Sequence, residues 1–109
     1  MSKFERVIKE VIQFRDERDW EQFHNSKDLA LAISIEAAEL NELFLWKKPE
    51  QVDPERLKDE LADILTFCII LAHQNKLDIP DIIRQKLNKN AKKYPVDKSK
   101  GTAKKYTEL

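Results

Sequence analysis

Apolar residues recur along most of this chain at spacings of three and four, which is the repeat of an amphipathic α-helix. Polar segments and prolines divide the pattern into four long runs. The pattern therefore predicts an all-α protein with about four helices in a bundle. The predicted helices cover about residues 2–18, 26–46, 53–74 and 80–93.

The helix starts carry the residues that cap helices well. Ser2 is followed three residues later by a glutamate, which is the spacing of a capping box. Either Ser26 or Asp28 is suited to cap the second helix. Asp53 followed by Pro54 predicts the start of the third helix, because proline is favoured at the first helical position.

Length and composition restrict the class of protein. A chain of 109 residues with one glycine favours a single domain, residues 1–109, built from long helices with few tight turns. Residues 96–109 form a basic tail that we expect to be disordered or to lie over another surface. Twenty basic and twenty acidic residues balance to zero net charge, which argues against a nucleic-acid-binding protein.

We next consider the location that the sequence favours. No apolar run is long enough to cross a membrane, and no signal peptide is recognisable. A single cysteine excludes an internal disulfide. We therefore expect a cytoplasmic protein with no membrane partner.

Two pairs of acids stand in the second and third predicted helices. Glu36 and Glu39 form the first pair, and Glu60 and Asp63 form the second. At about 100° per residue, Glu36 and Glu60 fall inside the apolar arc of their helices, and their partners fall at its edge. By the same geometry Thr66 points away from the apolar arc. Two helices are thus predicted to carry the same half-buried acidic pattern.

Half-buried carboxylates are costly unless a cation balances them. No lysine or arginine lies on the matching face of either helix. A hard divalent cation such as Mg²⁺, which binds oxygen ligands and often a phosphate substrate, would satisfy these acids. The alternative is that they are helix-edge residues in ordinary surface salt bridges. A carboxylate-bridged redox bundle is disfavoured, because no histidine follows any of the four acids at the E-x-x-H spacing.

Several aromatic and polar residues are candidates for substrate contacts. Trp20 and Trp46 are suited to stack a nucleobase, or to anchor a core or a subunit interface. His24 lies near Trp20 and could bond a base or a phosphate, and Phe67 is a pocket wall or plain core.

The fourth predicted helix carries a run of basic and amide residues. Lys86, Asn90 and Lys93 recur at near-helical spacing before Tyr94, where they could hold phosphate oxygens. Lysines are frequent throughout residues 86–105, so a solvated surface is the alternative for each one.

The chain also resembles a known family. The segment EAAELNELFLWK (36–47), followed by DELADIL (59–65), is similar to the MazG-type all-α nucleoside triphosphate pyrophosphohydrolases. RDERDWEQFH (15–24) and KKYTEL (104–109) resemble the dCTP pyrophosphatase branch of that family. The resemblance implies hydrolysis of a deoxynucleoside triphosphate to the monophosphate and pyrophosphate, in nucleotide-pool sanitation. It also implies a homodimer or a homotetramer that is a dimer of dimers.

The resemblance implies roles for individual residues. By matching position, Glu36, Glu39, Glu60 and Asp63 bind Mg²⁺, for which Mn²⁺ is a substitute. Glu39 and Glu60 are the expected catalytic acids, and Glu39 is our choice for the acceptor of the attacking water's proton. The implied substrate-binding residues are Trp20, His24, Trp46, Phe67, Lys86, Asn90 and Tyr94.

Two positions depart from the dCTP branch. Val11 stands where the relatives have histidine, and Phe67 stands where they have tyrosine. Both changes remove a polar group near the expected pocket, which weakens the discrimination between bases. Two alternatives therefore stay open: a pyrophosphatase of broad specificity, and a non-catalytic helical interaction module.

Overall fold

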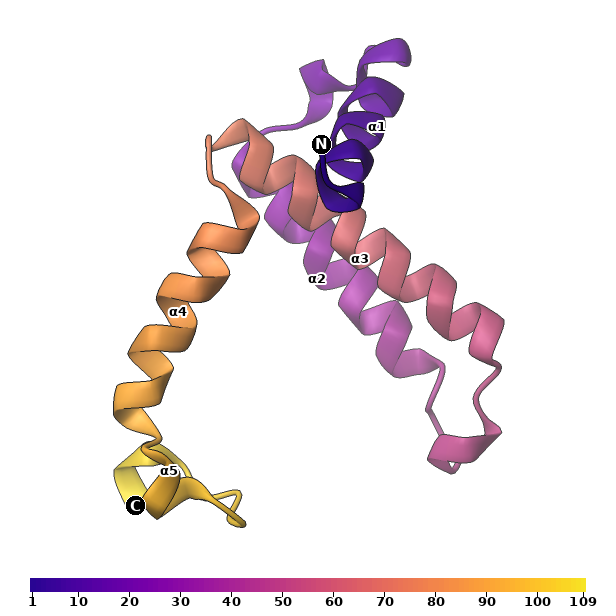
Figure 1. Cartoon of the computed structure of the whole chain (residues 1–109). Helices are drawn as coiled ribbons and strands as arrows, with labels where there is room; N and C mark the ends of the chain where they lie inside the picture. The colour runs from indigo at the N-terminus through magenta and orange to yellow at the C-terminus, as the bar shows by residue number, and fades with distance from the viewer. The chain divides into compact units, whose positions relative to one another are not determined.

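The computed structural model describes all 109 residues, and every long element in it is a helix (Figure 1). The all-α prediction is thereby confirmed. Contacts divide the chain into two compact units, Met1–Lys76 and Leu77–Leu109, which are described separately. The first unit contains α1 (Lys3–Glu17), α2 (Ser26–Glu42) and α3 (Pro54–Gln74), and the second contains α4 (Ile79–Lys93) and α5 (Val96–Ser99).

The first unit is a hairpin of two helices, α2 and α3, with a third helix, α1, packed against it. α2 and α3 lie side by side, and α1 packs against α3 near its C-terminal end (Figure 1). α3 therefore has neighbours on two sides, α2 on one and α1 on the other. The apolar side chains buried here belong to the α2–α3 hairpin, and they are Leu29, Leu43, Ile69, Ile70 and Ala72.

The predicted helix starts are confirmed at α1 and α3. Ser2 accepts a hydrogen bond from the backbone N–H of Glu5, whose carboxylate accepts one from Ser2 N–H in return. Asp53 caps α3, and Pro54 is its first residue. These caps satisfy backbone N–H groups that the helices leave without partners.

α2 begins at Ser26, as predicted, but its N-cap and its C-terminal end differ from the prediction. Its N-cap is Asn25, not Ser26 or Asp28, and the Asn25 side chain accepts a hydrogen bond from Asp28 N–H (2.8 Å). The helix ends at Glu42, four residues before the predicted end. Trp46 has a φ of 61°, a left-handed conformation that cannot continue a right-handed helix. Trp46 therefore lies outside the helix that carries Glu36 and Glu39.

Many large apolar side chains of the hairpin stay exposed. Leu31 and Ile35, one turn apart on α2, are 56% and 52% exposed. Leu61 and Leu65 repeat this arrangement on α3, and Leu65 is 59% exposed. Apolar side chains exposed in such numbers are typical of surfaces that other protein covers.

The second unit consists of α4 and the tail that follows it. Asp78 caps α4 by accepting a hydrogen bond from Asp81 N–H. The tail is ordered in part, since it forms α5 and a short 3₁₀ turn, Tyr106–Glu108. Tyr106 meets Tyr94 edge to face, with the ring centroids 6.1 Å apart. The tail thus lies over the end of α4, which is the second of the two alternatives expected for it.

None of the helices is both long enough and apolar enough to cross a lipid bilayer.

Candidate active site

Three carboxylates meet where α2 packs on α3. Glu36 comes from α2, and Glu60 and Asp63 come from successive turns of α3. One carboxylate oxygen of each lies within 4.8 Å of the others. Glu36 and Glu60 are half-buried, whereas Asp63 and the neighbouring Glu39 are exposed. The burial predicted from the helical pattern is thereby confirmed for all four acids.

Partial burial and mutual repulsion disfavour the charged forms of these acids. Partial burial, followed by contact with the Glu39 carboxylate, raises the pKa of Glu36 to about 7. Partial burial, followed by the charge of Glu39, also raises the pKa of Glu60. The cluster therefore favours a bound proton or a bound cation.

The oxygens that need a cation can be identified. Oε2 of Glu36 and Oε2 of Glu60 are both buried without a hydrogen-bond partner. The ion pairs of the structure join other residues, so no lysine or arginine balances the cluster. An all-oxygen ligand set with excess negative charge suits Mg²⁺ or Mn²⁺ and does not suit soft metals. The residues present therefore fit a hard divalent cation.

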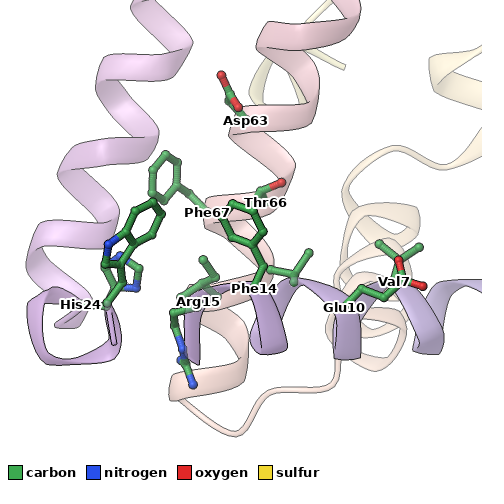
Figure 2. Close-up of a pocket in the computed structure, with 11 residues that line it drawn as sticks. Val7, Glu10, Phe14, Arg15, His24, Asp63, Thr66 and Phe67 are labelled. Atoms are coloured by element: carbon green, nitrogen blue, oxygen red, sulfur yellow. The ribbon is translucent and has the colours of Figure 1, made fainter. Parts of the chain in front are cut away.

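A pocket of about 520 Å³ opens beside the cluster, between α1, α3 and the loop that joins α1 to α2 (Figure 2). Asp63 belongs to both the cluster and the pocket wall. The pocket is lined by Val7, Glu10, Val11, Phe14, Arg15, Trp20, His24, Asp63, Thr66, Phe67 and Ile70.

Aromatic rings form much of the pocket wall. Phe14 and Trp20 meet edge to face with their centroids 5.9 Å apart. The Arg18 guanidinium lies 3.5 Å from the centre of the Phe14 ring, on the rim of this pair. Phe67 of α3 faces the pocket as well (Figure 2). Phe67 is therefore part of the pocket wall, and these rings offer flat apolar faces to the cavity.

The sequence pattern did not reveal all of this wall. Thr66 lies away from the apolar arc, as predicted, yet it lines the pocket, because α1 packs on that side of α3. Its hydroxyl donates to the carbonyl of Ala62 (2.7 Å). Arg15 was not singled out, although it lines the pocket and is 4% exposed.

A signal for the wall was nevertheless present. Val7, Val11 and Phe14 share one face of α1 at helical spacing, and this face lines the pocket. Apolar faces of this kind are ordinarily interpreted as core, so the sequence alone gave no reason to place a cavity there.

The structure brings together some of the predicted substrate residues. Trp20, His24 and Phe67 line the pocket, and Nδ1 of His24 is buried without a hydrogen-bond partner. Trp46 is 94% exposed and lies outside the pocket. Lys86, Asn90 and Tyr94 belong to the second unit, where Lys86 is exposed and Asn90 is half-buried. The roles of these last four residues stay predictions.

Comparison with known proteins identifies relatives of this chain. Residues 31–109 match the model of the MazG-like family. A pyrophosphatase from Archaeoglobus fulgidus, solved as a crystal structure, superposes with a TM-score of 0.81. It is 31% identical in sequence, and the superposition covers 87% of this chain and 94% of that one.

Curated relatives carry a more specific name. The chain is 42% identical to dCTP pyrophosphatase 1 of Bos taurus and 37% identical to dCTP pyrophosphatase 1 of Homo sapiens. Each match covers 89% of this chain. The chain spans 62% of the length of these relatives.

Proposed function

This chain belongs to the MazG-like family, and from that membership and the geometry of its acids we propose that it hydrolyses a deoxynucleoside triphosphate to the monophosphate and pyrophosphate. The relatives named dCTP pyrophosphatase 1 support dCTP or a modified dCTP as the substrate. Release of a damaged or unwanted nucleotide from the pool, as monophosphate, is the role that this reaction would serve.

The observation that carries the proposal is that Asp63 belongs both to the acidic cluster and to the pocket wall. Its carboxylate belongs to the acidic cluster, and its side chain also lines the aromatic pocket. A base held in the pocket would therefore have its phosphates beside the cluster. Phosphoryl groups and a hard divalent cation bind well together, because the cation offsets the charge of both the phosphates and the acids.

The residues divide the work as follows. Glu36, Glu39, Glu60 and Asp63 would hold Mg²⁺, with Mn²⁺ as a substitute. Bound there, the ion would neutralise phosphate charge and lower the pKa of the attacking water. Glu39, exposed and one helical turn from Glu36, is suited to accept that water's proton. The water's oxygen bonds to the α-phosphorus, the bond from that phosphorus to the bridging oxygen breaks, and pyrophosphate leaves with that oxygen.

Base selection would fall to the pocket. Val11 and Phe67 both line it, so two side chains that could have bonded a base offer only apolar contact. Trp20 supplies a stacking surface, and His24 supplies a nitrogen without a partner. A pocket with few polar contacts holds a pyrimidine well but rejects competing bases weakly. We therefore keep broad specificity as the second candidate function.

Assembly into a homodimer or homotetramer is part of the proposal. The support is the exposed apolar surface of α2 and α3, which contains Leu31, Ile35, Leu61 and Leu65. A second copy that covered these side chains would remove them from water, which stabilises the association. Light scattering would test this by comparing the molar mass of wild type with that of the double variant Leu31→Lys/Leu65→Lys. Equal masses for the two proteins would contradict assembly through this surface.

The decisive experiment measures pyrophosphate release with Mg²⁺ from each standard nucleoside triphosphate and from 5-methyl-dCTP. Glu60→Gln is the loss-of-function variant, and Glu42→Gln is its control. Glu42 is an exposed acid of α2 that lies outside the cluster. We expect release to be fastest from the cytosine deoxynucleotides, at least about 100-fold loss in Glu60→Gln, and wild-type rates in Glu42→Gln.

The other outcomes are equally clear. Similar rates for many bases, still lost in Glu60→Gln, would establish the broad-specificity enzyme. No release from any nucleotide would reject the enzyme and favour a helical interaction module.

A further inference from the structure

The loop between α1 and α2 carries two of the residues that line the pocket. Trp20 and His24 stand at either end of a short 3₁₀ turn, Glu21–Phe23. Their neighbour Phe23 is 65% exposed, so the turn has little core of its own. Its position against the pocket must therefore come from contacts at its two ends.

Arg15 holds the first end of the loop. Its carbonyl oxygen accepts hydrogen bonds from the N–H groups of Arg18 (3.2 Å) and Trp20 (3.1 Å). The left-handed Asp19, with a φ of 53°, turns the chain back so that Trp20 N–H reaches this carbonyl. The backbone of Arg15 thus fixes where the tryptophan leaves the helix.

The Arg15 side chain also contacts the loop. It is 4% exposed, and its guanidinium bonds Asp16 through Nε (3.0 Å) and Nη2 (2.9 Å). Nη2 also lies 3.7 Å from the Glu21 carboxylate of the loop. Figure 2 shows the guanidinium directed away from the Phe67 ring. Nη1 is buried without a hydrogen-bond partner, so the contacts that Nε and Nη2 make with Asp16 and Glu21 are the ones that offset the cost of desolvation.

Gln74 holds the second end of the loop. It is half-buried in the last turn of α3, and its Nε2 donates to the carbonyl of His24 (2.7 Å). Fifty residues separate the two partners in sequence. The helix that carries Glu60 and Asp63 therefore also fixes the loop that carries His24.

We propose that Arg15 and Gln74 are positioning residues, which hold the Trp20–His24 loop against the pocket and thereby set the affinity for the nucleotide. This inference rests on the proposed function for its substrate. Gln74 lies outside the pocket, and the Arg15 guanidinium is directed away from the Phe67 ring, so their loss acts through the position of Trp20 and His24. Nucleotide binding should weaken, and the rate of the bound complex should change little.

The test uses Arg15→Met, Gln74→Ala and the double variant in a Trp46→Phe background, where Trp20 is the remaining tryptophan. Arg6→Met in the same background is the control, because Arg6 is an exposed arginine of α1 whose one side-chain hydrogen bond is to the Met1 carbonyl. Three quantities are measured: Trp20 emission without nucleotide, KM and kcat for dCTP, and thermal unfolding.

Each positioning variant should shift Trp20 emission to longer wavelength and increase its quenching by acrylamide. Each should also raise KM about tenfold with kcat changed less than about threefold, as expected for loss of a charged or buried hydrogen bond. Arg15→Lys should recover part of the KM loss, since lysine keeps the charge but not the planar fork. Arg6→Met should match its background.

Unchanged Trp20 emission and KM in both single variants would overturn the proposal. A lowered melting temperature with unchanged KM would do so as well, because it would show a structural role alone. Since Gln74→Ala removes only an amide, it keeps the test usable if Arg15→Met fails to fold. Emission is read without nucleotide, so it reports on the loop even if the protein releases no pyrophosphate.

Discussion

Glu36 of α2 and Glu60 of α3 each bury one carboxylate oxygen without a hydrogen-bond partner, and the two side chains offer ligand oxygens within 4.8 Å of each other. Two acids in this arrangement destabilise the packed helices whenever both are charged. The site thus stores an unfavourable interaction that a cation would relieve. Stability lost in this way at a functional site is commonly offset by the rest of the fold.

The first prediction concerns the pH dependence of the metal-free protein. The pKa of Glu36 in the folded protein is about 7, above its ordinary value of 4.5. Its contribution to stability is therefore fully present below pH 4.5 and is lost as the pH rises through about 7. In EDTA, the melting temperature of Glu36→Gln should equal that of wild type at pH 5 and should be clearly higher than that of wild type at pH 8. Glu42→Gln should not reproduce that pH-dependent difference.

The second prediction concerns metal binding. Because the ligands must be deprotonated, Mg²⁺ and Mn²⁺ should raise the melting temperature more at pH 8 than at pH 6. Glu60→Gln or Asp63→Asn should weaken the affinity by about 10- to 100-fold or more, as does loss of groups that support a metal. Titration calorimetry measures this directly. No thermal shift with either ion at pH 8, with or without nucleotide, would favour the non-catalytic module.

The helical repeat predicted the acids well for a physical reason. Glu36 and Glu60 fall within apolar arcs, and an arc marks the side of a helix that packs on a neighbour. Their partial burial could therefore be predicted from their positions in the helical repeat. The end of the second helix was predicted at residue 46, because apolar residues continue beyond Glu42, where the helix ends. Helix ends depend on local backbone conformation, such as the positive φ of Trp46, which periodicity does not encode.

The pocket itself could not be predicted from the sequence. Phe14 and Val11 share an apolar face with the rest of α1, and nothing in that pattern separates a cavity wall from a filled core. The place of Thr66 in the pocket wall could not be predicted for a related reason. α3 is covered on two sides, and a single apolar arc describes only one of them. Which helices meet is decided by tertiary packing, and the cavity follows from that packing.

The third prediction addresses base selectivity. Val11→His and Phe67→Tyr, combined, would add polar groups at two apolar positions of the pocket wall. We expect kcat/KM for dCTP relative to dTTP to rise about tenfold, the value of one good hydrogen bond to a base. The comparison is made by competition between the two nucleotides. An unchanged ratio would show that selectivity resides outside these two positions.

The last prediction separates the two tryptophans. Trp20 packs against Phe14 and lines the pocket, so Trp20→Ala should raise KM by the loss of base stacking, about 1–3 kcal/mol. Trp46 is 94% exposed, so Trp46→Ala should leave the free energy of unfolding within about 0.5 kcal/mol of wild type. Chemical denaturation measures the second quantity on a diluted protein. If Trp46→Ala instead unfolds much more easily, Trp46 must be covered in solution, and the exposed surface of the hairpin would then be the first place to look for the chain that covers it.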